Sequence, residues 1–387
     1  MKLLHRYIFS SVATAAASGV LMFAFVLVTA NAMKDILERL ASGQIGLDMA
    51  ARLLLLLVPF TMSYAAPMGI LVGILVVLGR LSSRSEVVAM KSAGISIWRI
   101  SAPILLIAMM GTGVCFYVNN YFGPQCRTEY KSLLAGTIRN EPLSFIVPGR
   151  FIRDFPGYVF YVGERDGERL GNVWLWVLGP DKELRQFIQA REGSISFDEA
   201  ENALVLSVEK ATGQFRSDAV AGDLSQVAIE GELARTSFAM SLDKLLPEGN
   251  GKARPKKIAD MSLPQLLEAR AEALSEVEQA GEGTELKEQA RNLFAKYSYH
   301  VNRNFAFAYS VIALAMLGIP LGIKVGRQET YANMAVALAL SMLYFFMMIM
   351  VGWADRVASA YPQVLVWIPN LLFQTLGLFL MHRANRH

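Results

Sequence analysis

Long apolar runs lie toward both ends of the chain, and the middle alternates between apolar and polar residues. A hydrocarbon core about 30 Å thick needs roughly 20 apolar residues in a helix. Six stretches meet this requirement: Tyr7–Ala32, Leu53–Gly79, Ile97–Tyr121, Phe305–Ile323, Tyr331–Trp353 and Tyr361–Met381. The pattern predicts an α-helical membrane protein with three transmembrane helices on each side of an inserted domain. Pro59 and Pro67 are expected to kink the second helix.

The segment from Phe145 to Leu242 has the period-two pattern of β-strands. Four runs are rich in β-branched and aromatic residues: Tyr158–Val162, Asn172–Leu178, Ile195–Phe197 and Leu204–Val208. The turn residues Gly163–Gly167 follow the first run, and a hairpin signal separates the last two. Several short strands at this spacing predict a β-sandwich or an open barrel.

The run around Trp174 and Trp176 is apolar at every position. Two interpretations stay open at this stage. The strand is buried on both faces, or one face forms an apolar groove for lipid acyl chains.

After this β segment the pattern becomes helical over Leu263–Glu278 and Glu285–Tyr299, behind a Pro/Gly/Lys-rich linker at Asp243–Lys257. The sequence therefore predicts four parts. Residues 1–121 hold the first three transmembrane helices, 122–262 the β domain and linker, 263–304 a helical connection, and 305–387 the last three transmembrane helices.

Composition agrees with a membrane protein and narrows the function. Hydrophobic residues make up 53% of the chain and charged residues only 18%, against about 25% in an average soluble domain. The net charge of +4, without a basic aromatic tract, argues against nucleic acid as a partner. Cys115 and Cys126 would lie about 16 Å apart on one helix, so we expect free thiols.

Lysine and arginine bias sets the expected orientation. Unbalanced basic residues gather on one side if these helices alternate: Lys2, Arg6, Arg80, Arg84, Lys91, Arg99, Lys324, Arg327, Arg383 and Arg386. The short loops of the other side are balanced or nearly so, because they also contain acidic residues: Lys34, Asp35, Glu38, Arg39, Asp48 and Arg52 in one, and Asp355 and Arg356 in the other. Both termini are then cytoplasmic, and the middle domain is extracytoplasmic. A cleavage signal at Ala30–Ala32 is the alternative for the first helix, but its apolar run is longer than that of a signal peptide.

No nucleotide-binding or catalytic motif accompanies these segments. The chain lacks GxxxxGK[ST], HExxH and GxSxG sequences and any Cys/His metal cluster, so we expect no cofactor, no metal and no enzyme activity. An intramembrane enzyme would need facing ionisable residues at mid-membrane depth, where these helices have almost none. A mechanotransmission or sensory protein with an extracytoplasmic β domain is the remaining alternative to a transporter.

The loop Gly79–Ser96 carries the most specific signal. Ser83 followed by Glu86 matches a capping box, and Gly94 is placed to end a helix over about 83–94. Val87, Val88 and Met90 would form its apolar face, with Arg84 and Lys91 outside that face. Such a short amphipathic helix suits docking into a groove of a partner.

This loop resembles the coupling-helix signature of the LptF/LptG (YjgP/YjgQ) family of lipopolysaccharide export permeases. Further similar motifs are Gly318–Gly322, Trp367–Asn370 and Tyr299–Arg303. The arrangement of three transmembrane helices, a β domain and three more also agrees with the family.

The resemblance implies a fold, a function and partners. The inserted domain would be a periplasmic β-jellyroll. The chain would be a permease subunit of an ATP-driven ABC-type extractor that moves lipopolysaccharide from the inner membrane toward the outer membrane. Its partners would be a separate cytoplasmic ATPase, a second six-helix paralogous subunit, lipopolysaccharide and a periplasmic bridge protein.

The resemblance also implies roles for single residues. Glu86 would contact the ATPase, together with Arg84, Val87 and Met90. The residues placed to bind lipid phosphates would be Lys34, Arg39, Arg127 and Lys131. Simpler roles compete with each: helix capping for Glu86, a topology signal for Arg84, snorkelling for Lys34, and a solvated surface for Arg127 and Lys131. Lys34 favours the LptG type slightly, and the type stays open.

Overall fold

The computed structural model describes most of the chain. The described residues are 2–41, 45–140, 146, 148–153, 157–167, 169–179, 183–198, 203–215, 229–241, 257–279, 285–325, 330–354 and 362–386. The chain forms two compact units. The helical unit comprises Met1–Met33, Leu54–Arg127 and Lys257–His387. The β unit comprises Lys34–Leu53 and Thr128–Lys256. Most of the predicted linker Asp243–Lys257 lies outside the described residues.

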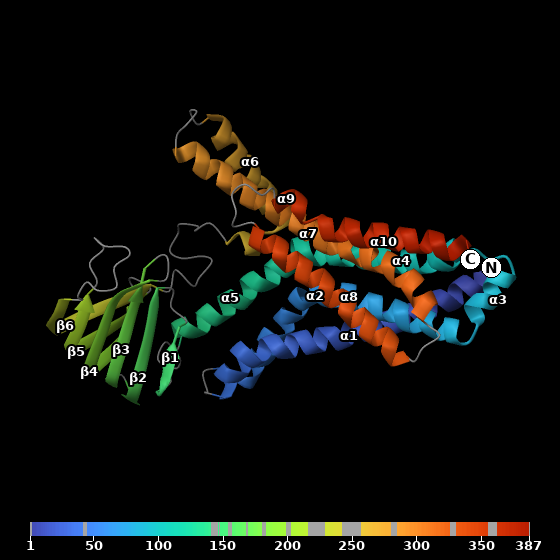
Figure 1. Ribbon diagram of the computed structural model, residues 1–387. Coiled ribbons are helices and arrows are strands. Elements are labelled where there is room, and N and C mark those ends of the chain that lie inside the picture. The colour runs from blue at the N-terminus through green and yellow to red at the C-terminus, as the bar shows by residue number, and fades with distance from the viewer. Residues whose placement is uncertain are drawn as a thin grey trace. The chain divides into compact units, whose positions relative to one another are not determined.

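Helices supply both halves of the expected membrane domain (Figure 1). Their bounds are α1 Lys2–Ala41, α2 Leu47–Ser83, α3 Glu86–Ser92, α4 Ile97–Tyr117, a π-helical turn Val118–Phe122, α5 Gly123–Asn140, α6 Leu263–Gln279, α7 Glu285–Val325, α8 Thr330–Ala354, α9 Pro362–Leu365 and α10 Ile368–Arg386. Within the described residues, six helical segments are long and apolar enough to cross a membrane. The prediction of a six-helix membrane protein with an inserted β domain is therefore confirmed.

Several helices extend beyond the apolar stretches predicted from the sequence. The first continues to Ala41, so Lys34 lies in a helix and not in a loop. The predicted helix Glu285–Tyr299 and the fourth transmembrane helix form the single helix α7. A helix can continue with polar residues after its apolar run has ended. The apolar run therefore marks the expected membrane-spanning part, and the helix itself ends further along the chain.

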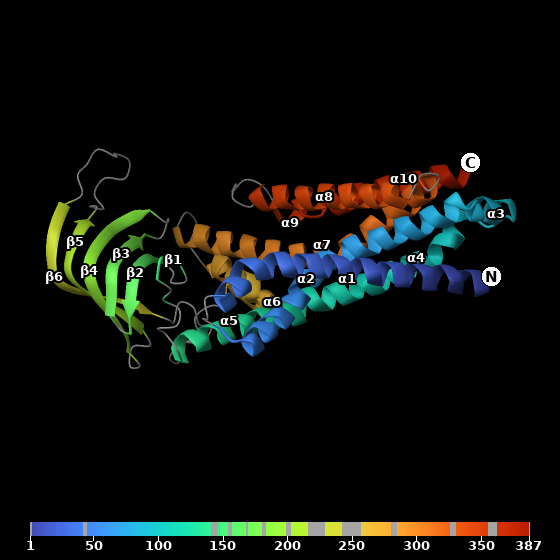
Figure 2. The same cartoon turned by 90° about the horizontal axis from the view of Figure 1, so that it is seen from below.

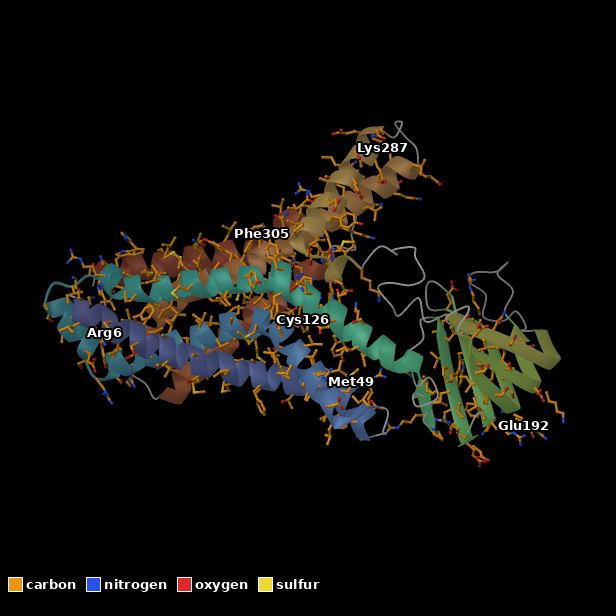
Figure 3. All side chains as sticks on the ribbon, turned by 180° about the vertical axis from the view of Figure 1, so that it is seen from behind. Arg6, Met49, Cys126, Glu192, Lys287 and Phe305 are labelled. Carbon is orange, nitrogen blue, oxygen red and sulfur yellow. The ribbon has the colours of Figure 1, made fainter. Side chains whose placement is uncertain are left out.

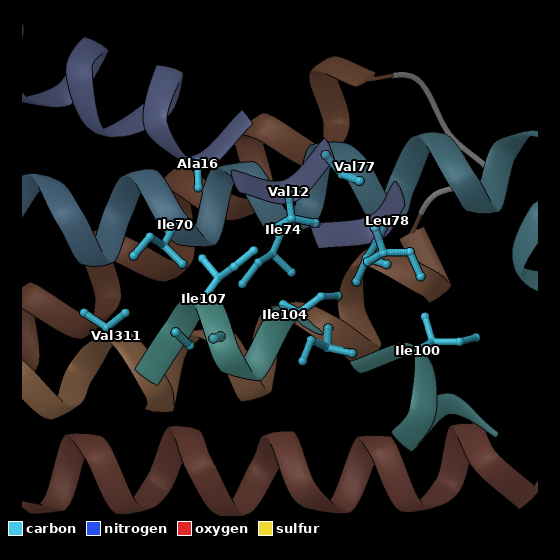
Figure 4. Close-up of a cluster of buried hydrophobic side chains, with 14 of the residues drawn as sticks. Val12, Ala16, Ile70, Ile74, Val77, Leu78, Ile100, Ile104, Ile107 and Val311 are labelled. Carbon is cyan, nitrogen blue, oxygen red and sulfur yellow. The ribbon is translucent and has the colours of Figure 1, made fainter. Parts of the chain in front are cut away.

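Burial differs strongly among the transmembrane helices. In the most apolar windows of α2 and α7, 72% and 78% of residues are buried, against 22% in α1 and in α8. Residues from α1, α2, α3, α4, α7 and α10 share one apolar cluster (Figure 4). Val12, Ile74, Ile104 and Val311 belong to this cluster. The helical unit is thus built around α2 and α7, and α1 and α8 keep broad exposed apolar faces.

Glycines allow the helix backbones to approach closely. A Cβ atom added to Gly69 would lie 2.3 Å from the backbone nitrogen of Val20, and one on Gly73 would lie 2.5 Å from that of Ala16. Both pairs join α1 to α2. Between α7 and α2, a Cβ on Gly318 would lie 2.7 Å from Leu71. Close approach through small residues is a common way for helices to associate in lipid.

Asn370 connects three helices of the helical unit. Its amide nitrogen donates to the Ala306 carbonyl at 2.9 Å, and its amide oxygen accepts a hydrogen bond from the Tyr344 hydroxyl at 3.0 Å. All three residues are fully buried. The Trp367 indole donates to Asn302 at 3.1 Å. The polar residues of the Trp367–Asn370 motif thus hold α10 against α7 and α8.

The β unit contains one antiparallel sheet with its described strands in sequential order. The strands are β1 Arg150–Ile152, β2 Tyr158–Asp166, β3 Arg169–Leu178, β4 Leu184–Asp198, β5 Ala203–Phe215 and β6 Ile229–Ser241. Figure 2 shows that the sheet is curved. The pair Phe197↔Leu204 confirms the predicted hairpin between β4 and β5.

The first predicted turn of the sheet is wrong. We expected Gly163–Gly167 to end the strand after Val162, but β2 continues through Asp166, which pairs with Arg169. The chain reverses only after Gly167, whose φ of 59° lies in the left-handed region. Pairing with β3 supplies backbone hydrogen bonds to residues whose side chains have little strand preference, so tertiary context overrides composition here.

The two faces of the sheet differ. One face carries the apolar cluster that includes Phe160, Val162, Val173, Leu175 and Ile188. The other carries a row of aromatic rings with centroids 5.1–6.1 Å apart, namely Phe151, Tyr161, Trp174, Trp176 and Phe187. Trp174 and Trp176 are half-buried within the unit. The strand is therefore buried on one face, and the aromatic face is partly exposed.

Candidate functional site

The predicted coupling helix exists but is shorter than expected. Helix α3 spans Glu86–Ser92, and its N-cap is Ser85, which has a φ of 60° and makes no side-chain capping bond. The predicted capping box is wrong, because Ser83 ends α2 and its hydroxyl donates to the Arg80 carbonyl at 2.9 Å. The backbone of α2 continues to Ser83, so this serine cannot adopt the extended conformation of an N-cap.

The end of α3 follows the prediction in detail. Gly94 has a φ of +77°. The Gly94 amide donates to the Lys91 carbonyl at 2.9 Å, and the Ile95 amide donates to the Met90 carbonyl at 3.0 Å. These two bonds are those of a Schellman motif, in which glycine takes the left-handed position without steric cost. The chain therefore reverses sharply between α3 and α4.

The residues of α3 divide between an inner and an outer face. Val87 is 2% exposed and belongs to the apolar cluster of the helical unit, and Met90 packs against that cluster. Glu86 is half-buried in the first turn, and Arg84 is exposed just before it. Val88, at 51% exposure, and Ala89 form the outer face. Of the four residues predicted to contact an ATPase, Val87 and Met90 therefore pack against the helical unit, and Arg84 and Glu86 remain accessible.

Contacts distant in sequence hold the flanks of α3. The Lys91 ammonium donates to the Ala384 carbonyl at 3.1 Å, and the Ile97 amide donates to the Asn385 side-chain oxygen at 3.3 Å. On the other flank, the Ser82 hydroxyl donates to the Ile323 carbonyl at 2.7 Å. The last turns of α7 and α10 therefore fix the hairpin that presents α3. Figures 1 and 2 show that α3 lies at the same end of the helical unit as both termini, called here the α3 end.

A second candidate site surrounds Arg127, at the start of α5. It is a pocket with about 610 Å³ of empty space, open solvent included, lined by α2, the π-helical turn, α5, α7 and residues 258–261. The Arg127 guanidinium donates to the Ala259 carbonyl at 3.0 Å, and its Cζ lies 4.1 Å from the centre of the Phe60 ring. In Figure 3, the labels Cys126 on α5 and Phe305 on α7 mark the two helices on which part of this pocket is built.

The same pocket contains cationic and polar residues that sequence reasoning did not select as site residues. Arg303 lies with its Cζ 5.4 Å from the centre of the Phe307 ring, and His300 is one turn earlier in α7. The rings of Phe60 and Tyr64 are 5.8 Å apart, and those of Tyr64 and Phe307 are 5.4 Å apart. Two arginines therefore rest on one aromatic series, which stabilises cations by cation–π attraction. The Tyr299–Arg303 motif was the sequence signal that pointed to Arg303. However, Arg127, which lines the same pocket, lies 176 residues earlier in the chain.

The other predicted phosphate ligands belong to the β unit. Lys131 lies four residues after Arg127 in α5 and is half-buried. Arg39 is half-buried in the last turn of α1. Lys34 lies in α1, and its side chain is outside the described residues. Within this unit, Glu38 and Arg150 form an ion pair at 2.6 Å.

Comparisons with known proteins match the chain almost throughout. A family model described as lipopolysaccharide export system permease LptF/LptG matches residues 6–383. The chain is 20% identical over 348 residues to the permease protein LptF of Escherichia coli K12, covering 89% of the chain and 85% of that protein. It is 28% identical over 134 residues to LptG of Haemophilus influenzae, covering 35% of the chain and 37% of that protein. To LptG of E. coli K12 it is 24% identical over 185 residues, covering half of that protein.

Proposed function

Because the chain belongs to the LptF/LptG family of lipopolysaccharide export permeases, we propose that it is one permease subunit of an ATP-driven extractor. The extractor would move lipopolysaccharide from the inner membrane toward the outer membrane. The observation that carries this proposal is the family match over residues 6–383, which includes both helical halves and the β domain between them. The chain itself would hydrolyse no ATP and would act as the transport subunit.

The proposed orientation places the α3 end in the cytoplasm and the β unit in the periplasm. The arginines and lysines near the short loops support this, because basic residues accumulate on the cytoplasmic side. A separate ABC-type ATPase would then meet α3 from the cytoplasm. The β unit would deliver lipid to a periplasmic bridge protein.

The exposed flank of α3 is the proposed ATPase contact. Glu86 lies at the start of a helix held by the Schellman motif and by Lys91 and Asn385. A helix fixed in this way can transmit force from a bound ATPase to the other helices without shifting relative to them. Arg84 and Glu86 would make the polar contacts, and Val87 and Met90 would fasten α3 to the apolar cluster.

A second six-helix subunit would cover apolar faces that this chain leaves open. In the described part of α8, Met342, Phe346 and Trp353 are 62%, 59% and 62% exposed, and Phe25 of α1 is 73% exposed. Both helices are also the least buried of the six candidate membrane helices. A cavity between two such chains would enclose the acyl chains of the lipid.

Lipid phosphates are the proposed partners of Lys34, Arg39, Arg127 and Lys131. Charge-assisted contacts with phosphate are strong and directional for arginine. Arg127 offers one group already positioned by the Ala259 carbonyl and the Phe60 ring. Lys131 lies one helical turn further, and residues four apart share a helix face.

The proposed ATPase contact is tested by purifying the protein from its native membrane in mild detergent and identifying bound proteins and lipids by mass spectrometry. We expect a soluble ABC-type ATPase, a six-helix paralogue and lipopolysaccharide. Glu86→Ala should lose the ATPase and keep the other two. Glu268→Ala removes an exposed glutamate of α6 and should keep all three. Absence of both ATPase and lipopolysaccharide from the wild-type sample would favour a sensory protein.

The phosphate contacts need a separate measurement. Arg127→Gln and Lys131→Gln should weaken binding of intact lipopolysaccharide about tenfold each, and change binding of its dephosphorylated form little. Lys296→Gln, at an exposed position of α7, is the matched charge control. An equal loss for the phosphorylated and dephosphorylated lipids would show that these residues act through structure and not through phosphate.

A further inference from the structure

A second hollow lies at the α3 end, beside the proposed ATPase contact, and the proposed export mechanism assigns no ligand to it. It contains about 1730 Å³ of empty space, open solvent included. Its walls come from α3 and from the last turns of α2, α7 and α10. Its lining includes the apolar residues Val87, Val88, Leu321 and Leu380 and the cations Lys91, Lys324 and Arg383.

The hollow is preformed, because its walls are joined to one another. The Lys91 ammonium donates to Ala384 of α10, and the Ser82 hydroxyl donates to Ile323 of α7. Both contacts connect segments that are more than 240 residues apart in the sequence. A site with fixed walls needs little reorganisation to bind a ligand.

The charge of the hollow is positive. The cations Lys91, Lys324 and Arg383 lie in its lining, and the lining contains no carboxylate among the described residues. Each sits in the last turn of its helix, where the helix dipole contributes about half a negative charge. Three full positive charges outweigh about one and a half negative ones, so the hollow favours an anion.

The ligand must also be apolar in part. Val88 is 51% exposed, and Leu321 and Leu380 form the wall on the side of α7 and α10. A soluble anion such as inorganic phosphate gains nothing from these side chains. A phosphate joined to acyl chains uses both the cations and the apolar wall. Basic pockets between the ends of membrane helices commonly bind anionic lipid headgroups.

We propose that this hollow binds an anionic phospholipid, with the phosphate at Lys91, Lys324 and Arg383 and the first part of the acyl chains against Val88, Leu321 and Leu380. The proposal rests on the membrane-spanning fold and is independent of lipopolysaccharide export. Because Val88 and Lys91 belong to α3, the bound lipid would contact the helix that faces the proposed ATPase.

Native mass spectrometry of the full chain tests the proposal, with phosphatidylglycerol and phosphatidylcholine of identical acyl chains added in equal amounts and no ATPase present. We expect phosphatidylglycerol to be retained preferentially. The double variant Lys324→Ala/Arg383→Ala should lower its retention about 30-fold, since each cation near an anionic lipid contributes a roughly fivefold factor. Both side chains are exposed, so the fold should survive.

The control variant Arg80→Ala/Arg99→Ala removes two exposed cations from the same end of the unit but outside the hollow, and retention should stay at the wild-type value. Val88→Glu adds a negative charge to the wall and should lower retention as well. Equal losses in the two double variants, or no preference for phosphatidylglycerol, would overturn the proposal.

Two further outcomes identify other occupants and would also overturn it. Full displacement of the lipid by excess inorganic phosphate would indicate a free-phosphate site. Wild-type protein without bound phosphatidylglycerol, but with an ATPase retained through Lys324 and Arg383, would indicate a protein-docking surface. ATPase binding by the Glu86→Ala variant tests the export proposal separately, because this substitution does not change the lining of the hollow.

Discussion

The helical unit and the sheet are held together by different means. In the helical unit, backbones meet at Gly69 and Gly73, and a buried amide at Asn370 joins three helices. In the sheet, the contacts are large apolar side chains on one face, among them Phe160 and Leu175, which are 0% exposed.

The surrounding solvent explains the difference. Lipid tails are as apolar as leucine, so burying a leucine between membrane helices gains little, and association depends on close packing and polar contacts. In water, removal of apolar surface is itself favourable by about 25 cal/mol per Å². The same kind of substitution should therefore have unequal effects in the two regions.

The largest expected effect is a bulky residue at the α1–α2 contact. Gly69→Leu places a side chain where even a Cβ atom would lie 2.3 Å from the Val20 backbone nitrogen. Backbone cannot move aside as a side chain can, so the cost should exceed the usual overpacking penalty of about 1–3 kcal/mol. We expect a much lower yield of folded protein and a lower melting temperature in detergent. Gly113→Leu, at a position with nothing within 4 Å, should change neither.

The second effect concerns burial in the sheet. Leu175→Ala leaves a cavity under β3 and should destabilise the β unit by about 2–5 kcal/mol. Urea unfolding followed by the fluorescence of Trp174 and Trp176 measures this change. Met342→Ala, on a 62% exposed position of α8, removes a similar side chain from an exposed face of the helical unit and should cost far less. Equal costs would contradict the comparison between the two regions.

The third effect is the loss of a polar contact inside the helical unit. Asn370→Leu removes the partners of the Tyr344 hydroxyl and the Ala306 carbonyl and should cost about 1–2 kcal/mol. Thermal unfolding in detergent reports it. Thr375→Val is the control, since its hydroxyl bonds only the local Leu372 carbonyl. A gain in stability on Asn370→Leu would mean that apolar packing, and not polar contact, joins these helices.

The smallest effect is expected at the ion pair of the β unit. Arg150→Ala removes the 2.6 Å contact with Glu38, but both side chains are more than half exposed. Exposed pairs contribute under about 1 kcal/mol and are screened by salt. The difference in urea midpoint between Arg150→Ala and wild type should shrink further in 1 M salt. A salt-independent loss would assign the effect to packing of the arginine stem.

The candidate sites were predictable to different degrees. The helix at Glu86, its end at Gly94 and the cations Arg127 and Lys131 came from spacing and from family resemblance. The residues that contact and position these groups could not be predicted in this way. Arg303, Asn385 and Ala384 lie far away in sequence, and nothing in a local pattern pairs Lys91 with a carbonyl at the other end of the chain.

What the sequence determined by itself is the set of membrane helices and the β domain between them, because both depend on the local period and length of apolar runs. It also determined the reversal after α3, since only glycine adopts that conformation without strain. The tertiary structure alone decided that α1 continues to Ala41, that Ser83 belongs to α2, that Val87 faces inward, and which face of β3 carries the half-buried tryptophans. Each of these depends on a neighbour that is distant in sequence, and the energy of such a contact is absent from any local pattern.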